Sequence, residues 1–125
     1  MDNNGFPSGE DMIRIYHNPR CSTSRKALET LQATGRPVEV IEYLHGLPPR
    51  DTLRALIGSA GLTVRQAMRS KEPIYESLGL ADPSLTDEQL LDAIEQHPVL
   101  LNRPFVVTDK GVRLCRPFEA IQEIL

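Results

Sequence analysis

The segment 13–31, with the sequence IRIYHNPRCSTSRKALETL, constrains the fold most, because its pattern changes from strand to helix within a few residues. The apolar run that contains Ile13 and Ile15 predicts a strand, and Asn18-Pro19 predicts the turn that ends it. Apolar residues then recur at helical spacing as far as Leu31. Cys21 is therefore expected where a strand turns into a helix.

This position favours a reactive thiol at Cys21. A sulfur at the start of a helix faces unpaired backbone N–H groups and the positive end of the helix dipole. Both favour the thiolate, which is the nucleophilic form of cysteine. Arg25, and His17 if it is protonated, would add positive charge nearby. A small structural cysteine is the alternative, and we favour the reactive thiol.

The residues after this segment predict a second strand that pairs in parallel with the first. Gly35 can end the first helix, and Arg36-Pro37 extends the chain into the apolar residues 38–43. A strand, a helix and a strand in this order form a right-handed βαβ unit. A helical insertion is expected at about residues 49–97, and Thr86 with Gln89 forms a capping box for its last helix.

The C-terminal part predicts a β-hairpin and a final helix. Residues 105–108 and 112–114 have strand character, Asp109-Lys110-Gly111 supplies the turn, and Pro117 suits the first turn of a helix. The full order is βαβ, helices and ββα. It predicts an α/β protein with a small mixed sheet and a thioredoxin-like fold, in one domain over residues 13–125 that follows a flexible extension at residues 1–12.

Composition excludes several classes of function. The formal net charge of −3 gives no reason to expect a nucleic-acid partner, and no apolar run approaches the length of a membrane span. The two cysteines lie far apart and form neither a zinc pattern nor a disulfide scaffold, so no metal is expected. The polar, acidic N-terminus does not resemble a signal peptide. We therefore expect a cytoplasmic protein whose thiols stay reduced.

The residues that follow Cys21 limit its chemistry. Ser24 stands where a Cys-x-x-Cys pair would have its second thiol, and Ala27 stands where a Cys-x5-Arg phosphatase loop would have its arginine. A single nucleophilic thiol remains, and it needs an external reductant. The Ser24 hydroxyl either bonds to the thiolate or is an ordinary serine near a helix start. Cys115 is either a resolving thiol or a buried structural residue, and we favour the latter.

Three arginines, Arg69, Arg103 and Arg116, lie at element boundaries. The last two directly precede prolines, which keep their backbones extended, and Arg103-Pro104 is a candidate cis peptide bond. Three arginines around one thiol would bind a tetrahedral oxyanion, because each guanidinium group matches two of its oxygens. Spacing alone does not show that they converge, and each is otherwise explained as a surface residue.

Four segments resemble the arsenate reductases that use glutaredoxin: the segment quoted above, LTVRQAMRSKEPIYESLGL, QHPVLLNRPFVVTDKGVRLCRP and the closing FEAIQEIL. The resemblance extends over residues 13–125. It implies a thioredoxin-like fold with a helical insertion and Cys21 as the nucleophile. It also implies that His17 and Ser24 keep Cys21 ionised, and that Arg69, Arg103 and Arg116 bind arsenate.

The implied reaction reduces arsenate to arsenite through a covalent adduct on Cys21, with glutathione as co-substrate and glutaredoxin as redox partner. No bound cofactor is implied, and a monomer is expected. The alternative within this fold is a non-enzymatic redox regulator that binds RNA polymerase, usually through a Cys-x-x-Cys pair. Ser24 argues against a regulator, and the three arginines argue for an enzyme. A general thiol-dependent reductase also stays open.

Overall fold

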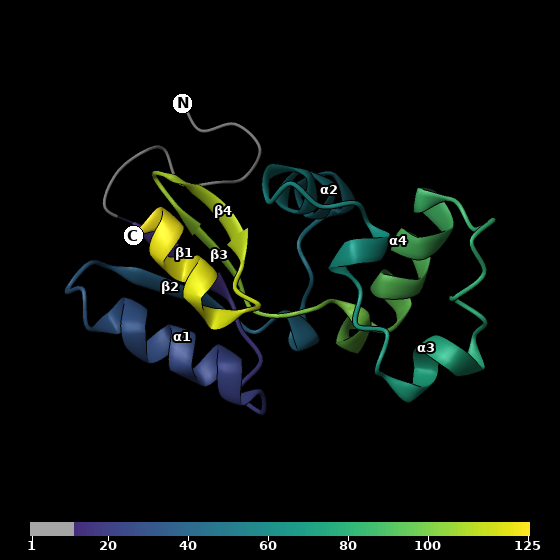
Figure 1. Ribbon diagram of the computed structural model, residues 1–125, viewed down its shortest axis with the longest axis horizontal. Helices are drawn as coiled ribbons and strands as arrows, with labels where there is room; N and C mark the ends of the chain where they lie inside the picture. The colour runs from purple at the N-terminus through teal and green to yellow at the C-terminus, as the bar shows by residue number, and fades with distance from the viewer. Residues whose placement is uncertain (1–11) are drawn as a thin grey trace.

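The computed structural model describes residues 12–125. The expected flexible extension at residues 1–12 lies outside the described residues except for Met12. These residues form four strands, four α-helices and several short 3₁₀ segments (Figure 1). The elements used below are β1 (Ile13–Tyr16), α1 (Ser22–Gln32), β2 (Val38–Ile41), α2 (Arg50–Ser59), α3 (Pro73–Ser77), α4 (Asp87–Gln96), β3 (Phe105–Thr108), β4 (Gly111–Leu114) and a C-terminal 3₁₀ segment (Phe118–Ile124).

The four strands form one mixed sheet in the order β2-β1-β3-β4. β1 pairs in parallel with β2 and antiparallel with β3, and β3 and β4 form an antiparallel hairpin. The register aligns Tyr16 with Phe105 and Phe105 with Leu114. The end of β1, the start of β3 and the end of β4 therefore lie at the same edge of the sheet. This topology brings together three segments that are far apart in the sequence.

The two faces of the sheet belong to different hydrophobic clusters, because side chains alternate along each strand. Ile13 and Ile15 of β1 pack with α1 and the C-terminal 3₁₀ segment, whereas Tyr16 packs with residues of the insertion. On β3, Val106 belongs to the cluster of Ile13 and Ile15, and Phe105 belongs to the cluster of Tyr16. Figure 1 shows α1 and the yellow C-terminal segment beside the sheet, while α3 and α4 lie away from it.

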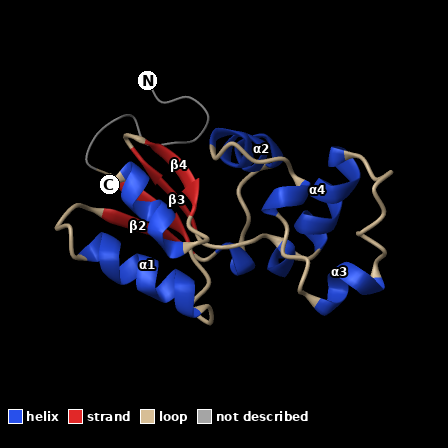
Figure 2. Cartoon of the chain, in the orientation of Figure 1, coloured by secondary structure: helices blue, strands red, loops and turns tan. Residues whose placement is uncertain are grey.

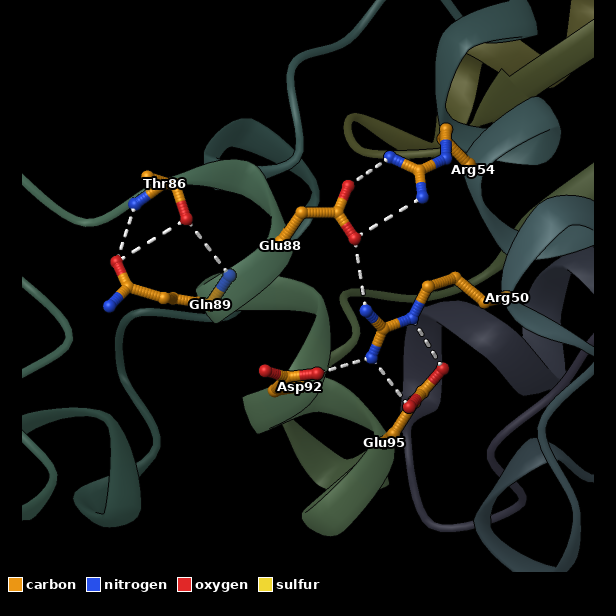
Figure 3. Close-up of polar contacts among 7 residues, drawn as sticks. All are labelled: Arg50, Arg54, Thr86, Glu88, Gln89, Asp92 and Glu95. Atoms are coloured by element: carbon orange, nitrogen blue, oxygen red, sulfur yellow. Dashed lines mark hydrogen bonds and ion pairs between the residues drawn. The ribbon is translucent and has the colours of Figure 1, made fainter.

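The segment between β2 and β3 contains helices and loops (Figure 2). Its helix α4 begins with the expected capping box, in which Gln89 N–H donates to the Thr86 hydroxyl and the Gln89 side chain accepts from Thr86 N–H. Arg50 of α2 binds three carboxylates along the exposed face of α4 (Figure 3). These ion pairs connect two helices of the insertion on its solvent side.

The end of β2, the C-terminal segment and one proline peptide bond were each addressed by the sequence predictions. The second strand ends at Ile41, and Tyr43 lies in a 3₁₀ turn, where its hydroxyl donates to the Leu101 carbonyl oxygen at 3.3 Å. The final helix after Pro117 is 3₁₀ rather than α. The peptide bond before Pro104 is cis, as expected, and the bond before Pro117 is cis as well.

Candidate active site

Cys21 occupies the N-cap position of α1, at the sheet edge where β1 ends. Its backbone is extended, its N–H donates to the Asn18 carbonyl oxygen at 3.0 Å, and its own carbonyl oxygen accepts from Arg25 N–H at 2.9 Å. The turn and the first helical bond therefore fix the residue from both sides. Its side chain is only partly buried, so the sulfur can be reached from solvent.

The surroundings of Cys21 lower the pKa of its thiol. Partial burial is the largest influence and opposes ionisation. It is outweighed by the backbone N–H of Ser24, the guanidinium groups of Arg103 and Arg116, and the backbone N–H of Thr23, all of which favour the thiolate. Two of these four donors belong to the first turn of α1, as expected for a sulfur at a helix start.

His17 and Ser24 form a buried pair beside the turn that precedes Cys21. Burial lowers the pKa of His17, against the opposing charge of Glu42 and with a smaller contribution from Arg25, so the neutral ring is favoured at neutral pH. The Ser24 hydroxyl lies 2.6 Å from His17 Nδ1 and accepts from Asn18 N–H at 3.1 Å. The Ser24 group that stabilises the thiolate is its backbone N–H, not its hydroxyl. The buried His17–Ser24 pair thus holds the turn that carries Cys21.

Arg103 and Arg116 reach Cys21 because of the strand register. Arg103 lies just before β3 and Arg116 just after β4, so both lie at the edge where β1 ends. Arg116 Nη1 lies 3.6 Å from the Cys21 sulfur and donates to the Arg103 carbonyl oxygen at 3.1 Å. Arg103 is buried, with a side chain that is 10% exposed.

Arg69 belongs to the insertion, and backbone contacts bring it close to the segment that carries Arg103. Met68 forms an isolated antiparallel bridge with Leu101, and Arg69 N–H donates to the Leu100 carbonyl oxygen at 2.7 Å. The chain before Arg69 therefore runs beside the chain before Arg103. A pocket of about 140 Å³ results, lined by Met68, Arg69, Ser70, Lys71, Asn102 and Arg116.

The structure also identifies site residues that the sequence reasoning missed. Lys71 and Asn102 line the pocket, and Glu72 forms ion pairs with Arg69 and Arg103. Tyr43 is buried, and the charges of Arg103 and Cys21 both influence its hydroxyl. One available signal was the Arg69–Glu72 spacing of three residues, which is typical of an ion pair on a helical turn.

Cys115 lies away from this chemistry although it precedes Arg116. It is fully buried in the cluster that contains Ile13 and Ala27, and burial raises the pKa of its thiol to about 12. A protonated, inaccessible thiol is a poor nucleophile. The structural interpretation of Cys115 therefore fits the structure, whereas a resolving role does not.

The described residues contain no group of histidine, cysteine, aspartate or glutamate side chains that could hold a metal ion. None of the helices formed by residues 12–125 is long and apolar enough to cross a membrane. What the site offers is a partly exposed, low-pKa thiol next to a small polar pocket with three cationic side chains, Arg69, Lys71 and Arg116. Such a site can bind an oxyanion and attack its central atom.

Comparison with known proteins identifies a matching family and close relatives of this chain. The sequence model described as the ArsC family matches residues 16–124. The chain is 53% identical over 113 residues to an arsenate reductase of Rhizobium meliloti (strain 1021), covering 90% of this chain and 81% of the relative. It is 50% identical over 113 residues to an arsenate reductase of Escherichia coli (strain K12), covering 90% and 80%.

A solved structure of an arsenate reductase from Vibrio cholerae superposes with a TM-score of 0.85 at 43% identity, covering 91% of this chain and 98% of that one. The predicted thioredoxin-like α/β fold with a small mixed sheet is confirmed by this similarity and by the observed topology. The range matched by the family model, residues 16–124, spans Cys21 and the three arginines. The chain therefore belongs to the ArsC family.

Proposed function

We propose that this protein is an arsenate reductase that works through a covalent adduct on Cys21. The observation that carries the proposal is the contact between a low-pKa thiol and a cationic pocket, in which Arg116 Nη1 lies 3.6 Å from the Cys21 sulfur. Relatives that are about half identical to this chain are named arsenate reductases. The family and the site geometry support the same oxidoreductase chemistry.

In the binding step, arsenate enters the pocket between Arg69 and Arg116. Guanidinium groups bind tetrahedral oxyanions through paired N–H donors, and Arg103 adds a buried charge at the sulfur side. Positive groups that are already in place also stabilise the charge that develops during attack. The substrate therefore meets the Cys21 sulfur with its negative charge neutralised.

In the chemical step, the Cys21 thiolate attacks the arsenic atom. A sulfur–arsenic bond forms and one arsenic–oxygen bond breaks, and the leaving oxygen takes up a proton and departs as water. The backbone N–H groups of Thr23 and Ser24 that stabilise the thiolate stay in place when the sulfur is released again. Covalent capture divides a difficult reduction into easier steps.

The reduction needs electrons from outside this site. Converting arsenate to arsenite takes two electrons, which two thiols supply when they become a disulfide, with water as the other product. Cys115 is buried and protonated, so it cannot supply the second thiol. We infer that glutathione adds to the adduct and that glutaredoxin reduces the resulting mixed species. We further expect a monomer in the cytoplasm without a resident cofactor.

The test is arsenite formation from arsenate by the purified protein, with and without glutathione and glutaredoxin. We expect turnover to require glutathione, to vanish in Cys21→Ser and to fall sharply in Arg69→Lys. Cys115→Ala is the matched control and should keep its activity, because that thiol lies outside the site.

Absence of turnover from the folded wild-type protein would overturn the assigned substrate. Activity that persists in Cys21→Ser would overturn the adduct, and activity that glutathione does not affect would overturn the electron source. A redox regulator that binds RNA polymerase would show no arsenite formation in any of these mixtures.

A further inference from the structure

Glu72 faces two of the site's arginines from the start of a helix. It is the N-cap residue of α3, directly before Pro73, and its backbone N–H donates to the Arg69 carbonyl oxygen at 3.2 Å. Its side chain is 20% exposed. Oε2 lies 3.2 Å from Arg69 Nε and 3.6 Å from Arg103 Nη1. One carboxylate oxygen thus bridges two guanidinium groups from different parts of the chain.

The bridge leaves hydrogen-bonding capacity on both arginines. On Arg69 the carboxylate takes the Nε–H, and no other side-chain partner is seen among the described residues. On Arg103 the buried Nε lacks a partner among the described residues, and besides Glu72 the Nη1 makes a long contact of 3.5 Å with the Val99 carbonyl oxygen. Among residues 12–125, Glu72 provides the carboxylate within ion-pair distance of these two arginines.

We propose that Glu72 is a positioning residue of the oxyanion site, whose carboxylate holds Arg69 and Arg103 in place before the anion arrives. The inference rests on the proposed function, because the anion concerned is arsenate. An arginine side chain loses much rotamer freedom when a ligand fixes it. Two arginines that Glu72 has already fixed lose less, so the oxyanion binds more tightly.

The negative charge of Glu72 acts in the opposite direction by repelling the oxyanion. The carboxylate is paired with two positive groups, and their charges reduce that repulsion. The two effects separate in Glu72→Gln, which removes the charge but keeps an oxygen that accepts from Arg69 Nε–H. Glu72→Ala removes both the charge and the acceptor.

The experiment measures binding of inorganic arsenate by titration calorimetry in a Cys21→Ser background, where no adduct can form. Glu72→Ala should weaken binding roughly tenfold, the lower end of the loss found when a group that orients a metal-binding side chain is removed. Glu72→Gln should bind within about threefold of its parent, because the acceptor is kept. Glu76→Ala is the matched control, since it removes an exposed carboxylate from the same helix and should change nothing.

Two further readouts test positioning rather than folding. With Cys21 intact, Glu72→Ala should raise KM for arsenate by the factor seen in binding, and Glu72→Gln should restore most of the loss. In an Arg69→Ala background the effect of Glu72→Ala should shrink, because one of the groups it holds is gone. Circular dichroism melting curves identify any variant that is not folded, and the Glu72→Gln comparison then carries the test.

Tighter arsenate binding in Glu72→Gln than in its parent would overturn the proposal, because repulsion would then dominate. Unchanged binding in Glu72→Ala, or an equal loss in Glu76→Ala, would overturn it too. The calorimetry does not depend on turnover. Failure of the wild-type protein to form arsenite would therefore refute the proposed function separately, through a different measurement.

Discussion

The contact between Arg116 and Cys21 allows the electrostatics of the site to be tested with one substitution. Arg116 Nη1 lies 3.6 Å from the sulfur, and the Arg116 side chain is exposed. Two opposite unit charges at about this distance attract by about 1 kcal/mol in water-like surroundings, and by several-fold more in a protein interior. Because solvent reaches this pair, the smaller figure applies. It corresponds to a roughly fivefold change in the thiolate population.

Arg116→Gln removes the charge and keeps a polar side chain with an N–H donor, although a shorter one. Because Arg116 favours the thiolate, its loss raises the pKa of Cys21, and the alkylation profile moves to higher pH. At a pH where the thiol is mostly protonated, we expect iodoacetamide to react about fivefold more slowly than with wild type. The difference should shrink in high salt. Arg103→Gln should have a larger effect, because Arg103 is buried.

Arg113→Gln is the control for this measurement. It removes the same charge from neighbouring β4, where Arg113 pairs with Glu123, and it should leave the alkylation profile unchanged. Identical profiles for Arg116→Gln and wild type would show that the start of α1 and Arg103 stabilise the thiolate without Arg116. The assignment of Arg116 to the thiolate site would then be wrong.

Three other predictions concern reactivity and stability. Native protein should take up one equivalent of iodoacetamide by intact mass, at Cys21, because Cys115 is buried with a thiol pKa of about 12; a second adduct without denaturant would contradict this. Thr86→Ala should lower the free energy of unfolding by about 1 kcal/mol in urea titrations, since it removes the capping box of α4. Burial lowers the pKa of His17 from 6.5, so as pH falls the unfolded chain takes up a proton on His17 before the folded chain does. The free energy of unfolding should therefore fall as pH drops below 6.5, and it should fall less in His17→Gln.

Features that depend on residues close together in the sequence could be predicted. Cys21 at the start of a helix, the capping box at Thr86 and the hairpin around Gly111 all depend on a few consecutive residues, and each is present. Tyr43 shows the limit of such patterns. The pattern of apolar residues predicted that the second strand would include Tyr43. In the structure Tyr43 lies in a 3₁₀ turn instead, and its hydroxyl donates to the Leu101 carbonyl oxygen.

Interactions of His17 and Ser24 could not be predicted from spacing, because they depend on burial. A histidine beside a thiolate can stabilise it by charge only if it is protonated, and burial lowers the pKa of His17. The Ser24 hydroxyl then bonds to the neutral ring rather than to the sulfur. Both residues lie at the site, where their hydrogen bonds support the turn before Cys21.

The arginines converge for two physical reasons, one set by the order of the strands and the other by a backbone contact of the insertion. Once β3 is placed antiparallel to β1 with β4 beside it, the short stretch before β3 and the short stretch after β4 must lie where β1 ends. Arg103 and Arg116 thus follow from strand order alone. Arg69 does not, because the insertion reaches the site through a backbone bridge between Met68 and Leu101 that no local pattern encodes. The sheet therefore builds the thiolate half of the site, and the insertion, through Arg69 and Glu72, completes the half that holds the anion.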